Sequence, residues 1–174
     1  MLDAAIYVLA TLVANYTAAW FIPLPVFGLV SVGTLAFGVT FTQRDRVHRF
    51  GRKAVYAMIM VAAVLNTLES LVLGVSGRVI LASFTAIILA EAADTEVYQR
   101  LLQRPWIQRV AGSNAVSIPL DTILFTLIAF AGVFPPVMLV AIMFGDIVLK
   151  AVISTIVAVR REVIMRLADR LTAG

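Results

Sequence analysis

Six long apolar segments follow one another along this chain, and each is long enough to cross a lipid bilayer as a helix. A transmembrane helix needs about 20 mostly apolar residues, and it must bond its backbone internally because lipid offers no partners. We predict spans at Leu2–Ile22, Val26–Thr42, Ala54–Val75, Val79–Tyr98, Asn114–Val133 and Val137–Val159. Tight turns are expected at Pro23–Pro25, Gly74–Gly77 and Pro135–Pro136. The predicted fold class is an all-α integral membrane protein, a six-transmembrane-helix bundle forming one domain over residues 1–174.

The amino-acid composition excludes a water-soluble fold of this length. Of 174 residues, 61% are hydrophobic and 14% are charged, whereas soluble domains carry about 25% charged residues. A small domain has too much surface for its volume to bury such an excess of apolar side chains. The lipid bilayer is therefore the expected solvent for most of this surface.

Basic residues gather in alternate connections between the predicted spans. Those between spans two and three, between spans four and five, and after span six are Arg44, Arg46, Arg49, Arg52, Lys53, Arg100, Arg104, Arg109, Arg160, Arg161, Arg166 and Arg170. The opposite connections contain only Arg78. Because cytoplasmic loops carry an excess of Lys and Arg, we predict an N-in/C-in topology in the inner membrane, with both termini cytoplasmic. The first span follows no basic segment, so we do not expect a cleaved signal peptide.

Ionisable side chains fall well within the predicted spans, among them Glu69, Glu91, Asp94, Asp121, Asp146 and Lys150. Charged groups are costly in the hydrocarbon layer, so each of them is by default a functional-site hypothesis. A rise of about 1.5 Å per residue places Asp121, Asp146 and Asn66 near the middle of the bilayer. Of these, Asp121 is the strongest candidate for contact with a ligand.

Polar residues share helical faces within three of the spans. In span five, Asn114, Ser117 and Asp121 lie at positions i, i+3 and i+7 and form one polar stripe. Pro119 lies within this stripe and is expected to free the backbone carbonyl of Ala115. Similar clusters comprise Asn66, Glu69 and Ser70 in span three, and Ser83, Glu91 and Asp94 in span four.

Structural explanations stay open for several of these residues. Asp146 and Lys150 are four residues apart, in the favourable order for an ion pair on one helix. Glu91 and Asp94 are close enough to the membrane interface to be hydrated there. Serines within spans form hydrogen bonds between packed helices more often than they contact ligands.

Small side chains form a ridge on the first span, where Ala10, Ala14 and Ala18 recur at four-residue spacing. Such a ridge lets another helix approach closely. That helix belongs either to the same bundle or to a membrane partner. Asn15 lies beside the ridge, on a face that is placed to contact a ligand.

Several kinds of chemistry are excluded by residues that the sequence lacks. It has no cysteine and one histidine, His48, so no metal or haem site is expected. The string Gly74-Val-Ser76-Gly77 matches that of rhomboid proteases, but Ser76 and His48 are predicted on opposite sides of the membrane. No phosphate-binding loop of the form G-x-x-x-x-G-K-[ST] is present. We therefore predict no enzyme activity and no cofactor. The net charge of +4 is a signal of topology, so no role with nucleic acid is expected.

Two strings of residues resemble the signature of a known transporter family. One runs from Gly77-Arg78-Val-Ile-Leu-Ala82-Ser83 to Ala90-Glu91-Ala-Ala-Asp94-Thr-Glu-Val-Tyr98, and the other joins Ser113-Asn114, Leu120-Asp121-Thr122-Ile-Leu-Phe125 and Ile128-Ala-Phe130. They are similar to the fourth and fifth spans of the queuosine precursor transporters, also called the vitamin uptake transporter family. Asn15 and Lys150 fit the family more loosely. The resemblance covers residues 5–155.

This resemblance implies a six-helix importer of 7-cyano-7-deazaguanine or a related deazapurine, similar in fold to the substrate-binding components of energy-coupling-factor transporters. In those components an alanine-ridged first helix docks to a membrane partner, and the face of Ala10, Ala14 and Ala18 resembles that ridge. Two alternatives stay open. One is an importer or binding component for another vitamin-like molecule that depends on an energising partner. The other is a membrane adaptor without transport activity.

The chemistry of a deazaguanine suits the polar residues of the predicted spans. Its N–H and amino group lie side by side and can donate to one carboxylate, and its carbonyl needs a donor. Its flat ring fits an aromatic slot, for which Tyr16, Phe84 and Phe125 are available. The residues predicted to bind it are Asn15, Asn66, Glu69, Arg78, Ser83, Glu91, Asp94, Asn114, Ser117, Asp121 and Lys150. The cyano form is uncharged, so it requires no anion site.

Overall fold

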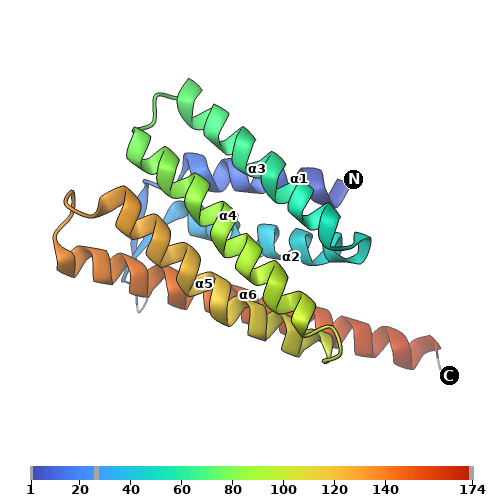
Figure 1. Cartoon of the computed structure of the whole chain (residues 1–174). Helices are drawn as coiled ribbons and strands as arrows, with labels where there is room; N and C mark the ends of the chain where they lie inside the picture. The colour runs from blue at the N-terminus through green and yellow to red at the C-terminus, as the bar shows by residue number, and fades with distance from the viewer. Residues whose placement is uncertain (1, 26–27, 173–174) are drawn as a thin grey trace.

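The computed structural model describes the backbone of residues 2–25 and 28–172, and the side chains as far as residue 164. The predicted start of span two at Val26 lies outside the described residues. In chain order the elements are α1 (Leu2–Tyr16), β1 (Phe21–Leu24), β2 (Gly28–Ser31), the 3-10 helix η1 (Val32–Ala36), α2 (Phe37–Val47), the 3-10 helix η2 (His48–Phe50), α3 (Arg52–Val72), α4 (Gly77–Arg100), α5 (Trp106–Phe130) and α6 (Pro136–Thr172) (Figure 1).

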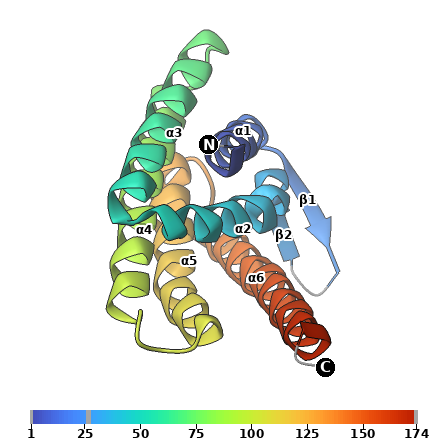
Figure 2. The same cartoon turned by 90° about the vertical axis from the view of Figure 1, so that its right-hand side faces the viewer.

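Helices α3, α4 and α5 lie in a row in which α4 contacts both neighbours, and α6 packs against α5 (Figure 1). Seen at 90° to this view, α1, α2 and the β1–β2 hairpin lie on one side of the row (Figure 2). Helix α2 contacts both α1 and α6. The six helices therefore surround a common centre.

Three described helices are long and apolar enough to cross a membrane, namely Arg52–Val72, Trp106–Phe130 and the Pro136–Ile164 part of α6. Helix α1 is apolar but shorter. These four correspond to predicted spans three, five, six and one, and α4 corresponds to span four. The predicted helical membrane fold is confirmed to this extent, while six spans and the N-in/C-in orientation stay predictions.

The first two predicted spans are wrong as uninterrupted helices. Helix α1 ends at Tyr16, and Phe21–Leu24 then pairs antiparallel with Gly28–Ser31. Pro23 and Pro25 lack the N–H that a helix needs, whereas an edge strand tolerates proline. The backbone at this break is bonded internally, since the Val32 N–H donates to the Trp20 carbonyl over 2.8 Å. At the prolines, where a tight turn was predicted, the chain thus forms a hairpin whose strands replace part of both predicted helices.

Helices α5 and α6 are each longer at one end than the span predicted for them. Helix α5 begins at Trp106 and not at Asn114, and α6 continues to Thr172 and not to Val159. Both predicted ends lie at the limits of the apolar segments. Arg and Gln are good helix formers, so the helices continue past the apolar segments into polar sequence.

Replacing Gly33 with alanine is expected to cost about 1–3 kcal/mol of stability, because η1 packs directly on the backbone of α1. A Cβ at Gly33 would lie 2.3 Å from the Ala14 carbonyl oxygen. Thermal unfolding of the purified protein in detergent measures this loss. The matched control is Gly77→Ala, whose Cβ would meet nothing within 4 Å. Equal stability of the two variants would contradict the close packing of α1 on η1.

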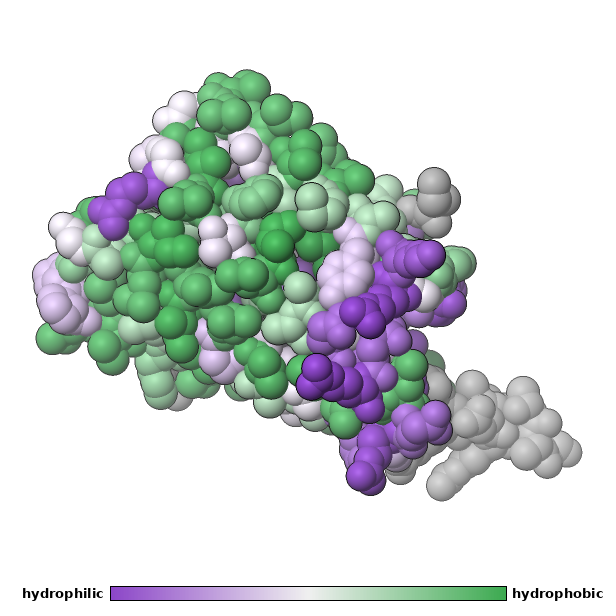
Figure 3. Space-filling view, in the orientation of Figure 1, coloured by the Kyte–Doolittle hydropathy of each residue, from purple (hydrophilic) through white to green (hydrophobic). Residues whose placement is uncertain are grey.

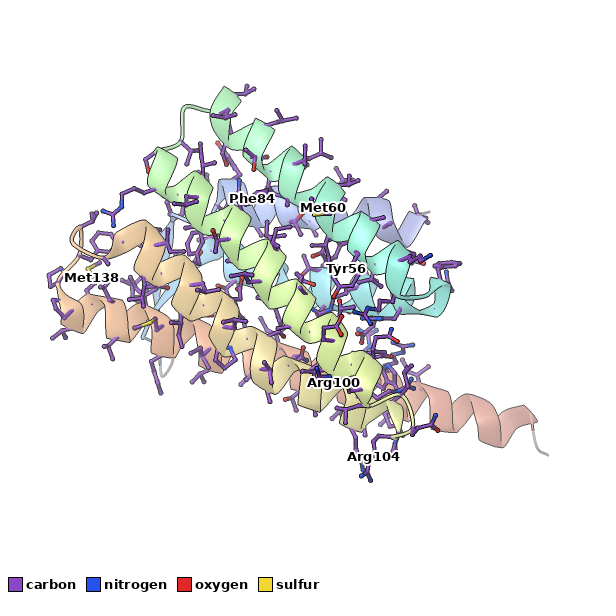
Figure 4. The ribbon with its side chains drawn as sticks, in the orientation of Figure 1. Tyr56, Met60, Phe84, Arg100, Arg104 and Met138 are labelled. Atoms are coloured by element: carbon purple, nitrogen blue, oxygen red, sulfur yellow. The ribbon has the colours of Figure 1, made fainter. Side chains whose placement is uncertain are left out.

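Hydrophilic residues gather at one end of the bundle. In the space-filling view apolar side chains cover most of the face, and polar ones cluster near the α2–α3 and α4–α5 connections (Figure 3). Arg100 and Arg104 lie at this end, whereas Met138 lies near the opposite end (Figure 4). The charge asymmetry of the sequence is therefore also an asymmetry of the folded molecule.

Reporter fusions should locate this polar end in the cytosol. We expect a cytosolic signal from fusions after Arg49 and Arg104, and an external signal from a fusion in the turn at Pro135. The reason is the positive-inside rule, because basic residues are retained on the cytoplasmic side. Paired alkaline phosphatase and fluorescent-protein fusions measure both sides. A cytosolic signal at Pro135 would contradict the predicted orientation.

Candidate functional site

A cavity of about 140 Å³ lies in the centre of the bundle, and every α-helix contributes to its wall. We call it the central cavity. Its aromatic wall is formed by Tyr7, Phe37 and Phe125. Its polar wall comprises Thr11, Asn15, Ser31, Thr34, Thr40, Arg44, Asn66, Ser83, Glu91, Ser117, Asp121, Thr122, Asp146 and Lys150. Concave sites with an apolar wall and a few convergent polar groups are typical of small-molecule binding.

Arg44 of α2 is the centre of a buried ionic cluster at the cavity wall. Its two terminal nitrogens lie 3.0 Å from Glu91 Oε2 and 3.0 Å from Asp94 Oδ1, both on α4. The same guanidinium donates to Asn114 Oδ1 over 3.3 Å, and the Ser117 hydroxyl donates to Asp94 Oδ1 over 2.9 Å. Arg44 is only 2% exposed. One cation therefore joins α2 to the polar faces of α4 and α5.

Lys150 of α6 forms a second ionic contact, with α5. Its Nζ lies 2.7 Å from Asp121 Oδ2 and donates to Thr122 Oγ1 over 3.0 Å. The ion pair of Lys150 with Asp146, left open by the sequence, is not formed. Asp146 Oδ1 instead accepts the Ser31 N–H over 3.1 Å and the Thr34 hydroxyl over 2.9 Å. The facing helix offers Lys150 a closer carboxylate than its own helix does.

A third set of polar contacts joins α1 to α3 and α4. The Asn15 amide donates to Ser70 Oγ over 2.8 Å and to Glu69 Oε2 over 3.2 Å. The Ser83 hydroxyl donates to Asn15 Oδ1. Asn66 donates to Thr11 Oγ1 over 3.1 Å. Asn15 of α1 therefore links the polar residues predicted on span three to Ser83 of span four beside the cavity.

Comparison with known protein families decides the classification. The model of the family described as "Putative vitamin uptake transporter" matches residues 54–160, more than half of the chain. The chain belongs to this family. The predicted membership of the vitamin uptake transporter family is thereby confirmed. No curated protein and no solved structure matches the chain.

Family membership and the apolar helices together identify a multi-pass membrane protein, embedded in lipid, whose family takes up small molecules. The matched region contains α3 from its third residue onward, α4, α5 and the part of α6 that lines the cavity. Glu91, Asp121 and Lys150 therefore lie within the match. Arg44 and Asn15 lie outside it, in the segment that completes the cavity.

Seven of the eleven predicted binding residues line the central cavity, namely Asn15, Asn66, Ser83, Glu91, Ser117, Asp121 and Lys150. Three others, Glu69, Asp94 and Asn114, lie behind the wall and bond to residues that form it. Arg78 lies elsewhere. It is exposed, and it donates to the Ala131 carbonyl over 2.6 Å. The structure thus brings together all the predicted site residues except Arg78.

Sequence reasoning missed Arg44, which it assigned to a cytoplasmic loop. Thr40, Gln43 and Arg44 lie at i, i+3 and i+4, and all three are buried. This helical spacing of polar residues indicates an inward face, but it extends past Thr42, where the predicted span ends. Ser31 and Thr34 were missed because the segment containing them was predicted as plain helix.

The aromatic slot also differs from the prediction. Phe125 lines the cavity as expected, but Tyr16 and Phe84 are 50% and 40% exposed and lie outside its wall. Tyr7 and Phe37 take their place. Tyr16 and Phe84 each directly follow a lining residue, Asn15 and Ser83, so the apolar pattern alone did not distinguish the inner from the outer face.

His48 lies at the polar end and not in an open loop. It is buried in η2, and its ring stacks on Tyr98 with ring centroids 4.2 Å apart. Burial, assisted by the positive charges of Arg44 and Arg109, lowers the pKa of His48 to about 4. His48 is therefore neutral near pH 7.

Proposed function

We propose that this chain is an inner-membrane importer of a queuosine precursor, 7-cyano-7-deazaguanine or a related deazapurine, which it binds in the central cavity. Both termini are cytoplasmic in this proposal. The observation that carries it is the open carboxylate of Asp121 beside the amine of Lys150, in a cavity with aromatic walls. Family membership supports the uptake of a small vitamin-like molecule.

Asp121 is the acid in this site with the most open side chain. It is 32% exposed, compared with 17% for Glu91 and 0% for Asp94. A carboxylate can accept the neighbouring N–H and amino group of a deazaguanine as a bidentate pair. Asp121 is therefore assigned to the donor edge of the ring.

Lys150 is assigned to the carbonyl of the same ring. Its ammonium group has three N–H donors, and two of them are used by Asp121 and Thr122. The third can donate to a carbonyl oxygen of the cargo. Phe125 and Phe37 supply the apolar surface against which a flat ring packs.

Complementation of a queuosine-auxotrophic cell tests the proposal. The cells lack their own importer and receive either 7-cyano-7-deazaguanine or another vitamin, and queuosine in transfer RNA is measured alongside growth. Restoration of queuosine by the deazaguanine, with the empty vector as control, supports the proposal. Rescue of growth by a different vitamin would contradict this cargo and favour the first alternative. Absence of any uptake would favour a membrane adaptor.

The alternative of an energising partner requires a free docking face. Ala14 and Ala18 line the central cavity, and Ala10 is half-buried. Within the bundle, the backbone of Ala14 packs against Gly33 of η1. This placement favours an importer whose alanine ridge serves internal packing over docking of a partner at that face.

A further inference from the structure

Asp146 is a buried carboxylate that forms no direct ion pair with a described residue, although the charge of Lys150 acts on it from a longer distance. It lies within the apolar Pro136–Ile164 segment, is 5% exposed and lines the central cavity. Among the described residues no Lys, Arg or His nitrogen lies within 4 Å of it, since Lys150 pairs with Asp121. An unpaired charge is expensive at this depth in a membrane and is usually retained for function.

Two hydrogen bonds orient the carboxyl group of Asp146. The Ser31 N–H and the Thr34 hydroxyl both donate to Oδ1. Hydrogen bonds donated to a carboxylate favour its ionised form. No described group donates to Oδ2. The second oxygen is therefore available to a ligand.

The donors to Asp146 come from the interrupted segment between α1 and α2. Ser31 ends β2 and Thr34 lies in η1. In membrane transporters, ion and substrate sites commonly lie where a helix is broken, because the irregular backbone supplies polar groups. The Ser31 hydroxyl also donates to the Ala18 carbonyl over 2.9 Å, which fixes this irregular segment against the turn that follows α1.

The cavity wall as a whole has more negative than positive charge. It carries two bases and three acids, and Arg44 is shared with Asp94 behind the wall. Asn66 provides a separate indication. It is 1% exposed and lines the cavity, and its Oδ1 has no hydrogen-bond partner among the described residues. Both features call for a ligand that brings donors and positive charge.

We infer that the central cavity binds a monovalent cation against Asp146, either an ammonium group carried by the cargo or a small metal ion bound beside it. This inference rests on the proposed function for the nature of the cargo. It changes one expectation from the sequence, namely that an uncharged cargo suffices. The site would prefer the aminomethyl form of a deazaguanine to its cyano form, or would require sodium for the cyano form.

The first experiment tests whether the cation is an ammonium group of the cargo. It is a calorimetric titration of the purified protein at pH 7, in choline chloride without sodium. The ligands are 7-cyano- and 7-aminomethyl-7-deazaguanine, which share one ring. The aminomethyl form is expected to bind about 10- to 100-fold more tightly, as a charge-assisted bond allows. Replacing choline with sodium tests whether the cation is a metal ion bound beside the cargo. In that case we expect tighter binding of the cyano form. Asp146→Asn should abolish whichever effect is found.

The variant is designed to fold, because asparagine keeps an acceptor oxygen for Ser31 and Thr34. The matched control is Glu96→Gln, which removes a carboxylate paired with Arg52 at the polar end. It should behave as wild type. If Asp146→Asn does not fold, Thr34→Val replaces it, and a reduced effect is expected because the carboxylate loses one donor. Equal binding of both ligands without a sodium effect would overturn the inference, as would an effect that survives in the folded variant.

Failure of the proposed function gives a different result. Neither deazaguanine would then bind under any condition. The cation site would still be measured without cargo, as a rise in unfolding temperature on adding sodium or methylammonium chloride. A rise in wild type that is lost in Asp146→Asn supports the site, and no rise with either salt overturns it.

Discussion

Replacing Arg44 with methionine is expected to destabilise the protein by about 3–5 kcal/mol and to abolish transport, since it leaves two buried carboxylates without their cation. Methionine keeps much of the length of the arginine stem, so the loss of charge is the main change. Glu91 and Asp94 both lie 3.0 Å from the guanidinium. Thermal or denaturant unfolding of the purified protein in detergent measures the loss.

The matched control for this variant is Arg46→Met, two residues along α2. Arg46 has a 52% exposed side chain and reaches Asp3 over 3.5 Å, and exposed ion pairs contribute about 0–1 kcal/mol. Adding Glu91→Gln and Asp94→Asn to Arg44→Met should recover part of the lost stability, because the buried charges are removed together. An Arg44→Met protein as stable as Arg46→Met would contradict the ionic cluster.

Asp121→Asn is expected to weaken binding of a deazaguanine by about 30- to 1000-fold, or 2–4 kcal/mol. Asparagine replaces one acceptor oxygen with a donor, so one donor of the cargo would face another donor. The variant also loses the 2.7 Å ion pair with Lys150. Calorimetric titration of the purified variant gives the affinity, and its unfolding gives the stability.

The double variant Asp121→Asn/Lys150→Met separates the effect on stability from the effect on binding. It should regain stability, because both charges are removed, but should not regain affinity, because both proposed contacts with the cargo are lost. Recovery of affinity together with stability would contradict direct contact of Asp121 and Lys150 with the cargo. Unaltered binding by a stable Asp121→Asn protein would exclude Asp121 as a ligand.

Much of the candidate site could be read from helical spacing. Asn114, Ser117 and Asp121 share one face of α5, and the structure turns that face toward the cavity and the Arg44 cluster. Helical spacing locates these residues at the centre because a polar side chain in an apolar helix packs in the interior of the bundle. Arg78 lies outside this group, at a helix end where its side chain is exposed.

The sequence by itself determined the membrane environment, the positions of α3 to α6 and the polar end of the molecule. These are local properties, since the length of an apolar segment and the spacing of charges are read along one stretch of chain. The tertiary structure alone decided the partners. Lys150 of α6 pairs with Asp121 of α5, and Arg44 of α2 pairs with Glu91 of α4. Asp146 accepts a hydrogen bond from Ser31 in the interrupted segment between α1 and α2. These pairings depend on distances between segments that are far apart in the chain, so the spacing of residues along the sequence does not predict them.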